Sequence, residues 1–231
     1  MPIRAMMLRG QSSAGGSDPY WGNVTSLLHF DGINGSTSFV DERGNSWSVM
    51  AGNPRLTTST AKFGPSSLRL PNGGYVSSPT ALGSGVGAGD FTIEGWFLAV
   101  NQSHRGLMHT ALTSSVAGIA IGHEDTAGGQ WQVYFNGTSY TASGLPLVLN
   151  TWQHFALVRI GTTCRLFISG NVVLTFTSPA NVTAPSMVIG CYWNSAFPWG
   201  WEGGVDEVRF TVGVGRYSGN FTPPSAPFPD A

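Results

Sequence analysis

The clearest alternation of hydrophobic and polar positions lies in residues 152–173, which read WQHFALVRIGTTCRLFISGNVV. Odd and even positions of 152–160 fall on opposite faces of an extended chain, and both faces are largely apolar. A strand that is apolar on both sides lies between two layers of a protein. Residues 161–163 then reverse the chain. The pattern predicts a hairpin at the centre of a β-sandwich, with Trp152 buried at its start.

Shorter alternating runs cover residues 24–30, 90–100, 117–123, 130–135 and 186–193. In 90–100, Phe91, Ile93 and Phe97 are expected on one face, with Thr92, Glu94 and Trp96 on the other. No ten-residue stretch has helical periodicity. We therefore expect a single all-β domain of about 11 to 14 strands with no internal linker.

Composition and charge argue against some classes of function. The chain has 32 Gly and 14 Pro, and 10% of its residues are charged, against about 25% in an average protein. Lys62 is the single lysine and the net charge is -1, so the sequence predicts no nucleic-acid binding and no electrostatic membrane binding. We also expect no membrane span and no secretory signal, because no apolar run has the required length.

Several motifs stand in a fixed order along the chain. They are DPYWGNV at 18–24, LLHFDG at 27–32, KFGPSSLRL at 62–70, DFTIEGWF at 90–97, GGVDEVRF at 203–210 and RYSGNFTPPSAPF at 216–228. Together with the hairpin, this set resembles the laminin-G-like domain of the concanavalin A-like lectin/glucanase superfamily, in the version found in bacteriophage structural proteins. The resemblance implies an antiparallel two-sheet jelly-roll sandwich over roughly residues 18–228.

The N-terminal residues 1–20 are predicted to form an extended arm, and residues 21–231 the jelly-roll domain. The arm ends in a Gly/Ser-rich hinge and has too little apolar area to pack alone. Its four apolar anchors are expected to dock on another chain: Ile3, Met6, Met7 and Leu8.

No catalytic residues are predicted. Retaining hydrolases need two carboxyl groups about 5 to 5.5 Å apart on one face, and the hydrolase pattern Glu-x-Asp-x-x-Glu of this fold is absent. Asp206 and Glu207 are adjacent and are expected to point to opposite faces of one strand. We interpret His29 and His154 as core histidines, and we expect a protein that is not an enzyme.

We expect that the protein requires no cofactor and binds no zinc. Asp41 and Asn45 lie in a turn that resembles the Asp-x-x-Gly-Asn calcium turn of related jelly rolls. The alternative is that both side chains hydrogen-bond within the turn. Cys164 and Cys191 are interpreted as two buried free thiols, although a pairing stays open.

The densest aromatic stretch is CYWNSAFPWGW at 191–201. Pro198 and Gly200 break any strand there, so its rings are expected on a loop, where they contact a glycan or a protein partner. The alternative is a lid over the end of the sandwich. The candidate contact residues are Tyr192, Trp193, Phe197 and Trp199, while Trp201 is expected in the core.

Two functions are compatible with these features. The first is a non-enzymatic structural protein of a bacteriophage virion, capsid-decorating or tail-associated, assembled in the host cytoplasm. It would bind other virion proteins, form a homo-oligomer and contact host surface glycans. The alternative is a free carbohydrate-binding module or lectin of a secreted bacterial protein.

Overall fold

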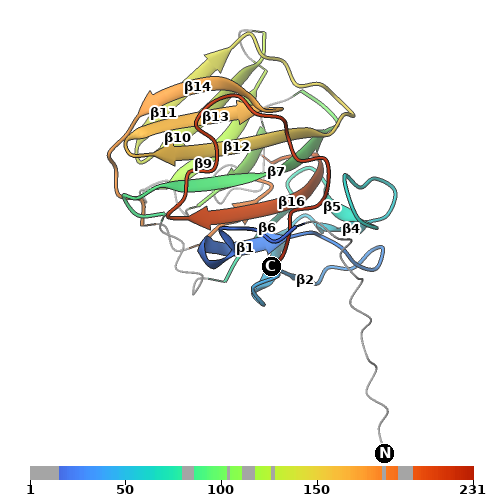
Figure 1. Cartoon of the computed structure of the whole chain (residues 1–231). Helices are drawn as coiled ribbons and strands as arrows, with labels where there is room; N and C mark the ends of the chain where they lie inside the picture. Colours follow the sequence, from blue (N-terminus) through green and yellow to red (C-terminus); the bar gives the residue numbers. More distant parts are fainter. Residues whose placement is uncertain are drawn as a thin grey trace, which may run out of the picture.

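Two β-sheets face each other in a computed structural model of the chain (Figure 1). The structure describes residues 16–79, 86–102, 105–110, 118–125, 128–183, 186–191 and 200–231. Named strands in this part of the chain pair antiparallel throughout. One short 3-10 turn, η1 (Trp21–Asn23), precedes them. The predicted all-β, two-sheet jelly-roll sandwich is confirmed.

The first sheet has the strand order β14-β13-β12-β7-β16-β5-β4, and β1 also pairs with β16. Its strands are β1 (Val24–Leu28), β4 (Arg55–Thr57), β5 (Ser67–Leu70), β7 (Phe91–Ala99), β12 (Gln153–Ile160), β13 (Thr163–Ile168), β14 (Asn171–Thr177) and β16 (Gly203–Val212).

The second sheet has the order β11-β10-β9-β8-β15-β6-β3-β2. Its strands are β2 (Phe39–Val40), β3 (Ser46–Ala51), β6 (Tyr75–Ser77), β8 (Arg105–His109), β9 (Ile119–Glu124), β10 (Gln130–Phe135), β11 (Thr138–Ser143) and β15 (Val188–Ile189). We call the side of each sheet that is turned away from the other sheet its outer face.

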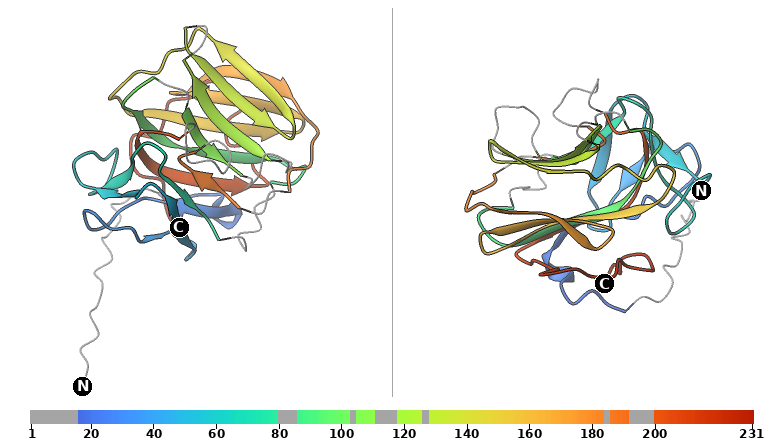
Figure 2. Two further views of the ribbon diagram at one scale, coloured as in Figure 1. Left: turned by 180° about the vertical axis from the view of Figure 1, so that it is seen from behind. Right: turned by 90° about the horizontal axis from the view of Figure 1, so that it is seen from above.

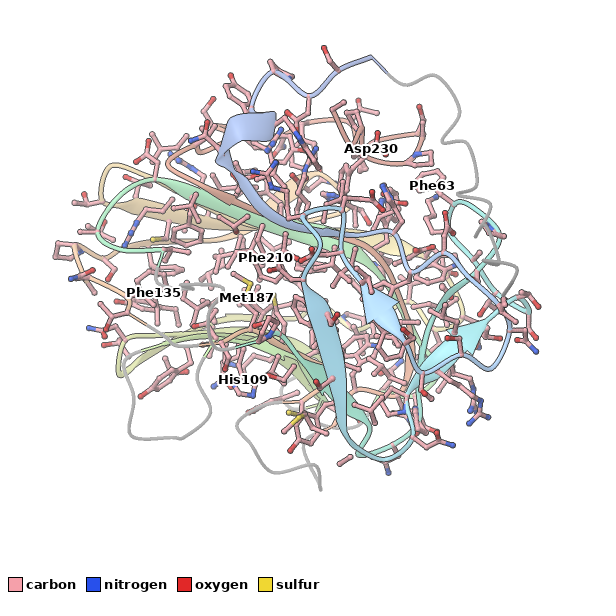
Figure 3. All side chains as sticks on the ribbon, turned by 90° about the horizontal axis from the view of Figure 1, so that it is seen from below. Phe63, His109, Phe135, Met187, Phe210 and Asp230 are labelled. Atoms are coloured by element: carbon pink, nitrogen blue, oxygen red, sulfur yellow. The ribbon has the colours of Figure 1, made fainter. Side chains whose placement is uncertain are left out.

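The hydrophobic core lies between the sheets and includes Phe135, Met187 and Phe210 (Figure 3). Phe97 packs edge-on against Trp201, with ring centroids 5.3 Å apart. Trp201 is fully buried, and its indole N–H donates to the Leu98 carbonyl at 3.2 Å. The predictions that Trp201 and the Phe91, Ile93 and Phe97 face of β7 are core are confirmed.

Strand β12 is apolar on both sides because it is covered on both sides. Its inner residues Phe155 and Leu157 belong to the main core, while Ala156 and Val158 form a second cluster on the outer face. The cover there is the C-terminal segment that follows β16, which passes beneath the first sheet in the view from above (Figure 2). The central position of this strand is confirmed.

Trp152 is half-buried, directly before the start of β12, rather than part of a core cluster. Its ring instead lies over Gly204 of β16, where an added Cβ would come within 2.8 Å of the indole.

Both cysteines are buried thiols outside any disulfide, as interpreted from the sequence, and the Cys191 sulfur lies 3.6 Å from His109 Nε2. Burial raises the pKa of Cys164 to about 11 and that of Cys191 to about 12. Both side chains are therefore protonated and unreactive at neutral pH. No helix in the described residues has the length and apolar character needed to cross a membrane.

The two tryptophans provide a test of this packing. Trp201→Ala should lower the free energy of unfolding by about 3 to 5 kcal/mol, because it removes a fully buried indole from the core. Trp152→Ala should cost clearly less, because its ring is half-exposed. Urea denaturation of both variants measures the difference, and equal losses would contradict this assignment.

Candidate functional site

The outer face of the first sheet carries a buried ionic network rather than an open binding surface. Glu94 of β7 and Arg209 of β16 form an ion pair at 2.8 Å. Arg209 also binds Asp18 at 3.0 Å, and the Tyr217 hydroxyl donates to Glu94 at 2.7 Å. All three charged groups are nearly inaccessible to solvent. Arg209 is further covered by the Phe228 ring, whose centroid lies 3.9 Å from the guanidinium carbon.

This network joins the two ends of the described chain. Asp18 accepts from Arg216 at 2.7 Å, and its backbone N–H donates to the Ala231 carbonyl. Burial alone would raise the pKa of Glu94, but Arg209, His154 and Tyr217 lower it to about 2. Asp18, which sequence analysis placed in the arm, is thus packed into the sandwich.

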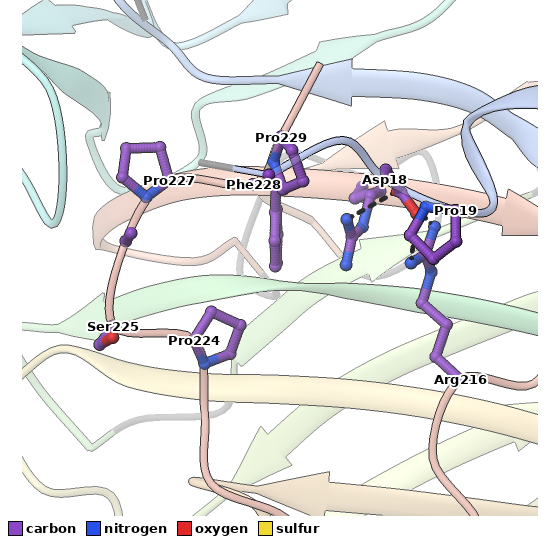
Figure 4. Close-up of a pocket in the computed structure, with 11 residues that line it drawn as sticks. Asp18, Pro19, Arg216, Pro224, Ser225, Pro227, Phe228 and Pro229 are labelled. Carbon is purple, nitrogen blue, oxygen red and sulfur yellow. Dashed lines mark hydrogen bonds and ion pairs between the residues drawn. The ribbon is translucent and has the colours of Figure 1, made fainter. Parts of the chain in front are cut away.

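A hollow of about 350 Å³ lies beside this network, between Asp18, Arg216 and the proline-rich residues 224–229 (Figure 4). Its walls include four prolines and Phe228. Its two guanidinium groups, from Arg209 and Arg216, are already bound to carboxylates. We interpret the hollow as the gap between residues 16–19 and the C-terminal segment rather than as a ligand site.

The carboxylates of Asp206 and Glu207 lie on the same side of β16, which corrects the expectation of opposite faces. Glu207 has a positive φ of 52°, and the register with β7 shifts between Asp206 and Arg209. This β-bulge adds one residue to the alternation, so both acidic residues lie between the inward-facing Val205 and Val208 on the outer face.

Neither of these two carboxylates is open to a substrate. Asp206 accepts from the backbone N–H groups of Lys62 and Phe63, at 2.8 and 3.2 Å. Glu207 binds His29 Nδ1 at 2.8 Å and the Phe228 N–H at 2.8 Å. Both are less than 3% exposed.

Burial, reinforced by Glu207, raises the pKa of Asp206 to about 8. Burial also raises the pKa of Asp31 to about 6. For His29, burial would lower the pKa, but the hydrogen bond and charge of Glu207 raise it overall. His29 is thus a hydrogen-bonded histidine, as predicted.

The Asp41 carboxylate accepts hydrogen bonds from groups in and around its own turn. Asp41 is buried, and its oxygens accept from the backbone N–H groups of Arg43 and Asn45 at 3.0 and 2.8 Å. They also accept from the Asn45 amide, the Trp47 indole and the Ser26 hydroxyl. These residues do not fit a calcium site, since the carboxylate is already saturated with donors, and the hydrogen-bonded alternative describes the turn. No group of three or more His, Cys, Asp or Glu in the described residues could hold a metal ion.

The other sequence-predicted site residues lie outside the described residues. These are the aromatic contact residues Tyr192, Trp193, Phe197 and Trp199, and the arm anchors Ile3, Met6, Met7 and Leu8.

The candidate site that the structure does describe is the outer face of strands β10 and β11. Trp131, Val133 and Phe135 of β10 point into the core, so the intervening residues point outward. Each faces a small hydroxyl residue of β11 in the antiparallel register. We call this surface the β10–β11 face, and it consists of Gln130, Gln132, Tyr134, Ser139, Thr141 and Ser143.

Polar groups on this face are held in place. The Gln132 amide donates to the Ser139 hydroxyl at 2.8 Å. Tyr134 is half-exposed, and its hydroxyl lies 3.9 Å from where a Cβ of Gly137 would be, so the ring reaches toward the hairpin turn.

The next strand, β9, contributes Glu124 opposite Gln130. Strands β9 to β11 contain no other Asp, Glu, Lys or Arg. Sequence reasoning missed this face because any half-exposed strand shows the same alternation.

Comparison with known proteins identifies the family. Residues 70–212 match the model of the Laminin_G_3 family, described as the concanavalin A-like lectin/glucanases superfamily, and the chain belongs to it. None of the curated proteins matches this chain.

Solved structures share the fold at low sequence identity. Domain 4 of AbnA, a GH43 extracellular arabinanase from Geobacillus stearothermophilus in complex with arabinotriose, superimposes with a TM-score of 0.63 at 15% identity, over 83% of this chain and 93% of that one. Trypanosoma rangeli sialidase gives 0.58 at 12% identity, over 82% of this chain and 30% of its own. A structure of botulinum neurotoxin type C, whose cell entry depends on two ganglioside molecules, gives 0.57 at 11% identity, over 83% of this chain and 48% of its own. These likenesses establish the fold alone.

The raised pKa of Asp206 predicts a pH-dependent stability. The folded protein keeps a proton on Asp206 up to about pH 8, whereas the group loses it at its ordinary value of 3.8 when exposed. This contribution to stability is therefore lost as pH rises from about 4 to about 8. Asp206→Asn does not titrate and retains an acceptor for Lys62 and Phe63. Its stability relative to the unmodified protein should thus increase between about pH 5 and about pH 9. Thermal unfolding at both pH values measures this, and a pH-independent difference would contradict it.

Proposed function

We propose that this domain is a non-catalytic carbohydrate-binding module that binds sugars on the β10–β11 face. The observation that carries the proposal is the combination of a half-exposed tyrosine with a row of amide and hydroxyl side chains on a rigid sheet surface. Tyr134 offers an apolar ring to the face of a sugar. The Gln and Ser/Thr groups offer both donors and acceptors for its hydroxyl groups.

The rigidity of this face supports the proposal. Antiparallel pairing fixes its backbone on both sides of β10, and the core residues beneath it are fully buried. A binding surface that is already ordered loses little conformational entropy when the ligand binds. The face is also nearly uncharged, which suits a neutral oligosaccharide. The AbnA domain, which has the same fold, was solved with arabinotriose, and this makes a neutral pentose oligosaccharide a suitable first ligand.

The arrangement of the acidic residues supports a role without catalysis. Asp206 and Glu207 are adjacent, but they are buried and bonded to Lys62, Phe63, His29 and Phe228. A glycosidic bond could reach them only after residues 62–63 and the C-terminal segment had moved away. Two carboxylates that flank an open cleft are what glycoside hydrolysis requires.

We further propose that the protein is part of a phage particle. This more specific proposal rests on the sequence motifs at 18–24 and 216–228. In that setting, the glycan-binding face would contact a host surface while the arm anchors Ile3, Met6, Met7 and Leu8 bind neighbouring virion proteins. Mass spectrometry of purified particles tests this location, since a virion protein is present there at a fixed copy number.

The binding proposal is tested with Gln132→Ala and Tyr134→Ala. The unmodified protein should bind neutral oligosaccharides on a glycan array, with arabinotriose as the first titrated ligand. Each substitution should weaken the affinity about tenfold, the equivalent of about 1.4 kcal/mol. Calorimetric titration measures the change.

Thr175→Ala is the matched control, because Thr175 is exposed on β14 of the other sheet. It should leave the affinity unchanged. The proposal is wrong if the unmodified protein binds no glycan, or if both substitutions leave glycan binding intact.

A further inference from the structure

Two arginines lie directly opposite each other at one end of the first sheet. Arg55 of β4 pairs with Arg69 of β5 in the antiparallel register. Each arginine has a leucine beside it on its own strand, Leu56 after Arg55 and Leu68 before Arg69. Both leucines point into the core, so both arginines lie on the outer face. Like charges at directly opposed positions destabilise a sheet. The pair is therefore a cost to the fold unless an anion binds to it.

Neither guanidinium group has an ion pair or a hydrogen bond within the described part of the chain. Arg69 is exposed and Arg55 is half-exposed. The chain contains 11 Lys and Arg residues in total, so the placement of two of them side by side is a pronounced local concentration of positive charge.

An aromatic surface lies next to this pair. The register continues from Arg69 to Gly204 of β16 and on to Leu98 of β7. Gly204 has no side chain, and the half-exposed indole of Trp152 occupies the space above it, 2.8 Å from where a Cβ would be. Adjacent strands are about 4.8 Å apart. The indole and the Arg69 guanidinium can therefore contact a single monosaccharide.

The other charged groups near this end of the sheet make contacts of their own. Lys62 adds a third positive charge at this end of the outer face, with its ammonium 4.0 Å from the Trp96 ring centroid. Asp206 lies opposite Trp96 in the strand register, and its carboxylate accepts hydrogen bonds from backbone N–H groups. Glu202 accepts a hydrogen bond from the Asn101 amide at 2.6 Å.

We propose that this surface, the arginine corner, is a second glycan site that binds a carboxylate-bearing sugar. The corner consists of Arg55, Arg69, Leu98, Trp152 and Gly204. The carboxylate lies between the two guanidinium groups, which offer planar pairs of N–H donors matched to its two oxygens. The sugar ring lies against the exposed part of the Trp152 indole.

This inference rests on the proposed function, because it assumes that the ligand is a glycan. The two sites differ in charge and lie on different sheets. The β10–β11 face suits neutral sugars, and the arginine corner suits acidic ones. Binding at the corner should weaken as the salt concentration rises, because the pair is close to solvent.

The test uses the whole chain and the double variant Arg55→Gln/Arg69→Gln. The probes are tri-galacturonate and 3'-sialyllactose, with the carboxyl-reduced trimer and lactose as their neutral counterparts. The unmodified protein should bind at least one acidic probe about tenfold more tightly than its neutral counterpart, and the double variant should lose this preference. The probe that binds distinguishes a uronate from a sialate ligand.

Arg165→Gln is the matched control, because it removes one positive charge from β13 of the same sheet. It should retain the preference. Trp152→Leu should weaken binding of the acidic probe, and its melting temperature shows whether the fold is intact.

The inference is overturned if acidic and neutral probes bind equally, or if the double variant binds the acidic probe as well as the unmodified protein does. Equal binding of a sulfated sugar without a carboxylate would overturn the assignment to carboxylates. If arabinotriose binds through Gln132 and Tyr134 while no acidic probe binds, the arginine corner fails and the β10–β11 face stands. If no glycan binds at all, the proposed function fails as well.

Discussion

The buried ion pair between Glu94 and Arg209 determines how the rest of the chain must be arranged. Two charges removed from water are costly unless every remaining polar group is satisfied. Here Asp18 and Arg216 add further ion pairs, Tyr217 donates to Glu94, and Phe228 covers Arg209. One partner comes from before the first strand and the others from after the last. Sealing the network therefore requires Asp18 and the segment that follows β16 to lie on the outer face of the first sheet.

That cover decides where a ligand can bind. The middle of the first sheet is closed by the C-terminal segment, and its acidic residues are used in holding that segment down. Two described surfaces outside that cover carry the proposed sites. One is the β10–β11 face of the second sheet, and the other is the end of the first sheet at β4 and β5, which the covering segment leaves open around Arg69 and Trp152.

The fold was largely predictable from sequence, because the signals are local and repeated. The two-sided apolar pattern of 153–160 correctly placed this strand between two layers. It could not show that one layer is an irregular segment. The bulge at Glu207 was also hidden, because a one-residue insertion changes the face of a side chain without changing the composition of the strand. The β10–β11 face and the arginine corner depend on cross-strand register between residues far apart in sequence, which no single-strand pattern encodes.

The distribution of positive charge shows why the corner is distinctive in this protein. Arg159, Arg209 and Arg216 are each bound by groups of the fold itself. Arg159, for example, donates to the carbonyls of Gly87, Gly89 and Ala180 at 2.6 to 2.8 Å. Arg55 and Arg69 have no such partner among the described residues, and the proposed carboxylate would supply one.

The separation of the two surfaces has a consequence for avidity. They lie on different sheets of the sandwich, with the core between them, so one short oligosaccharide cannot contact both. Residues that share no partners usually contribute additively, and binding at one site should leave affinity at the other unchanged. A surface that displays both neutral and acidic sugars at high density is a different case. Once one site is bound there, binding at the second site, in the same domain or in a neighbouring copy, is effectively intramolecular. The protein then dissociates from the surface more slowly, although the affinity of each site is unchanged. Two weak sites of different charge would thus favour a mixed, densely glycosylated surface over either free sugar.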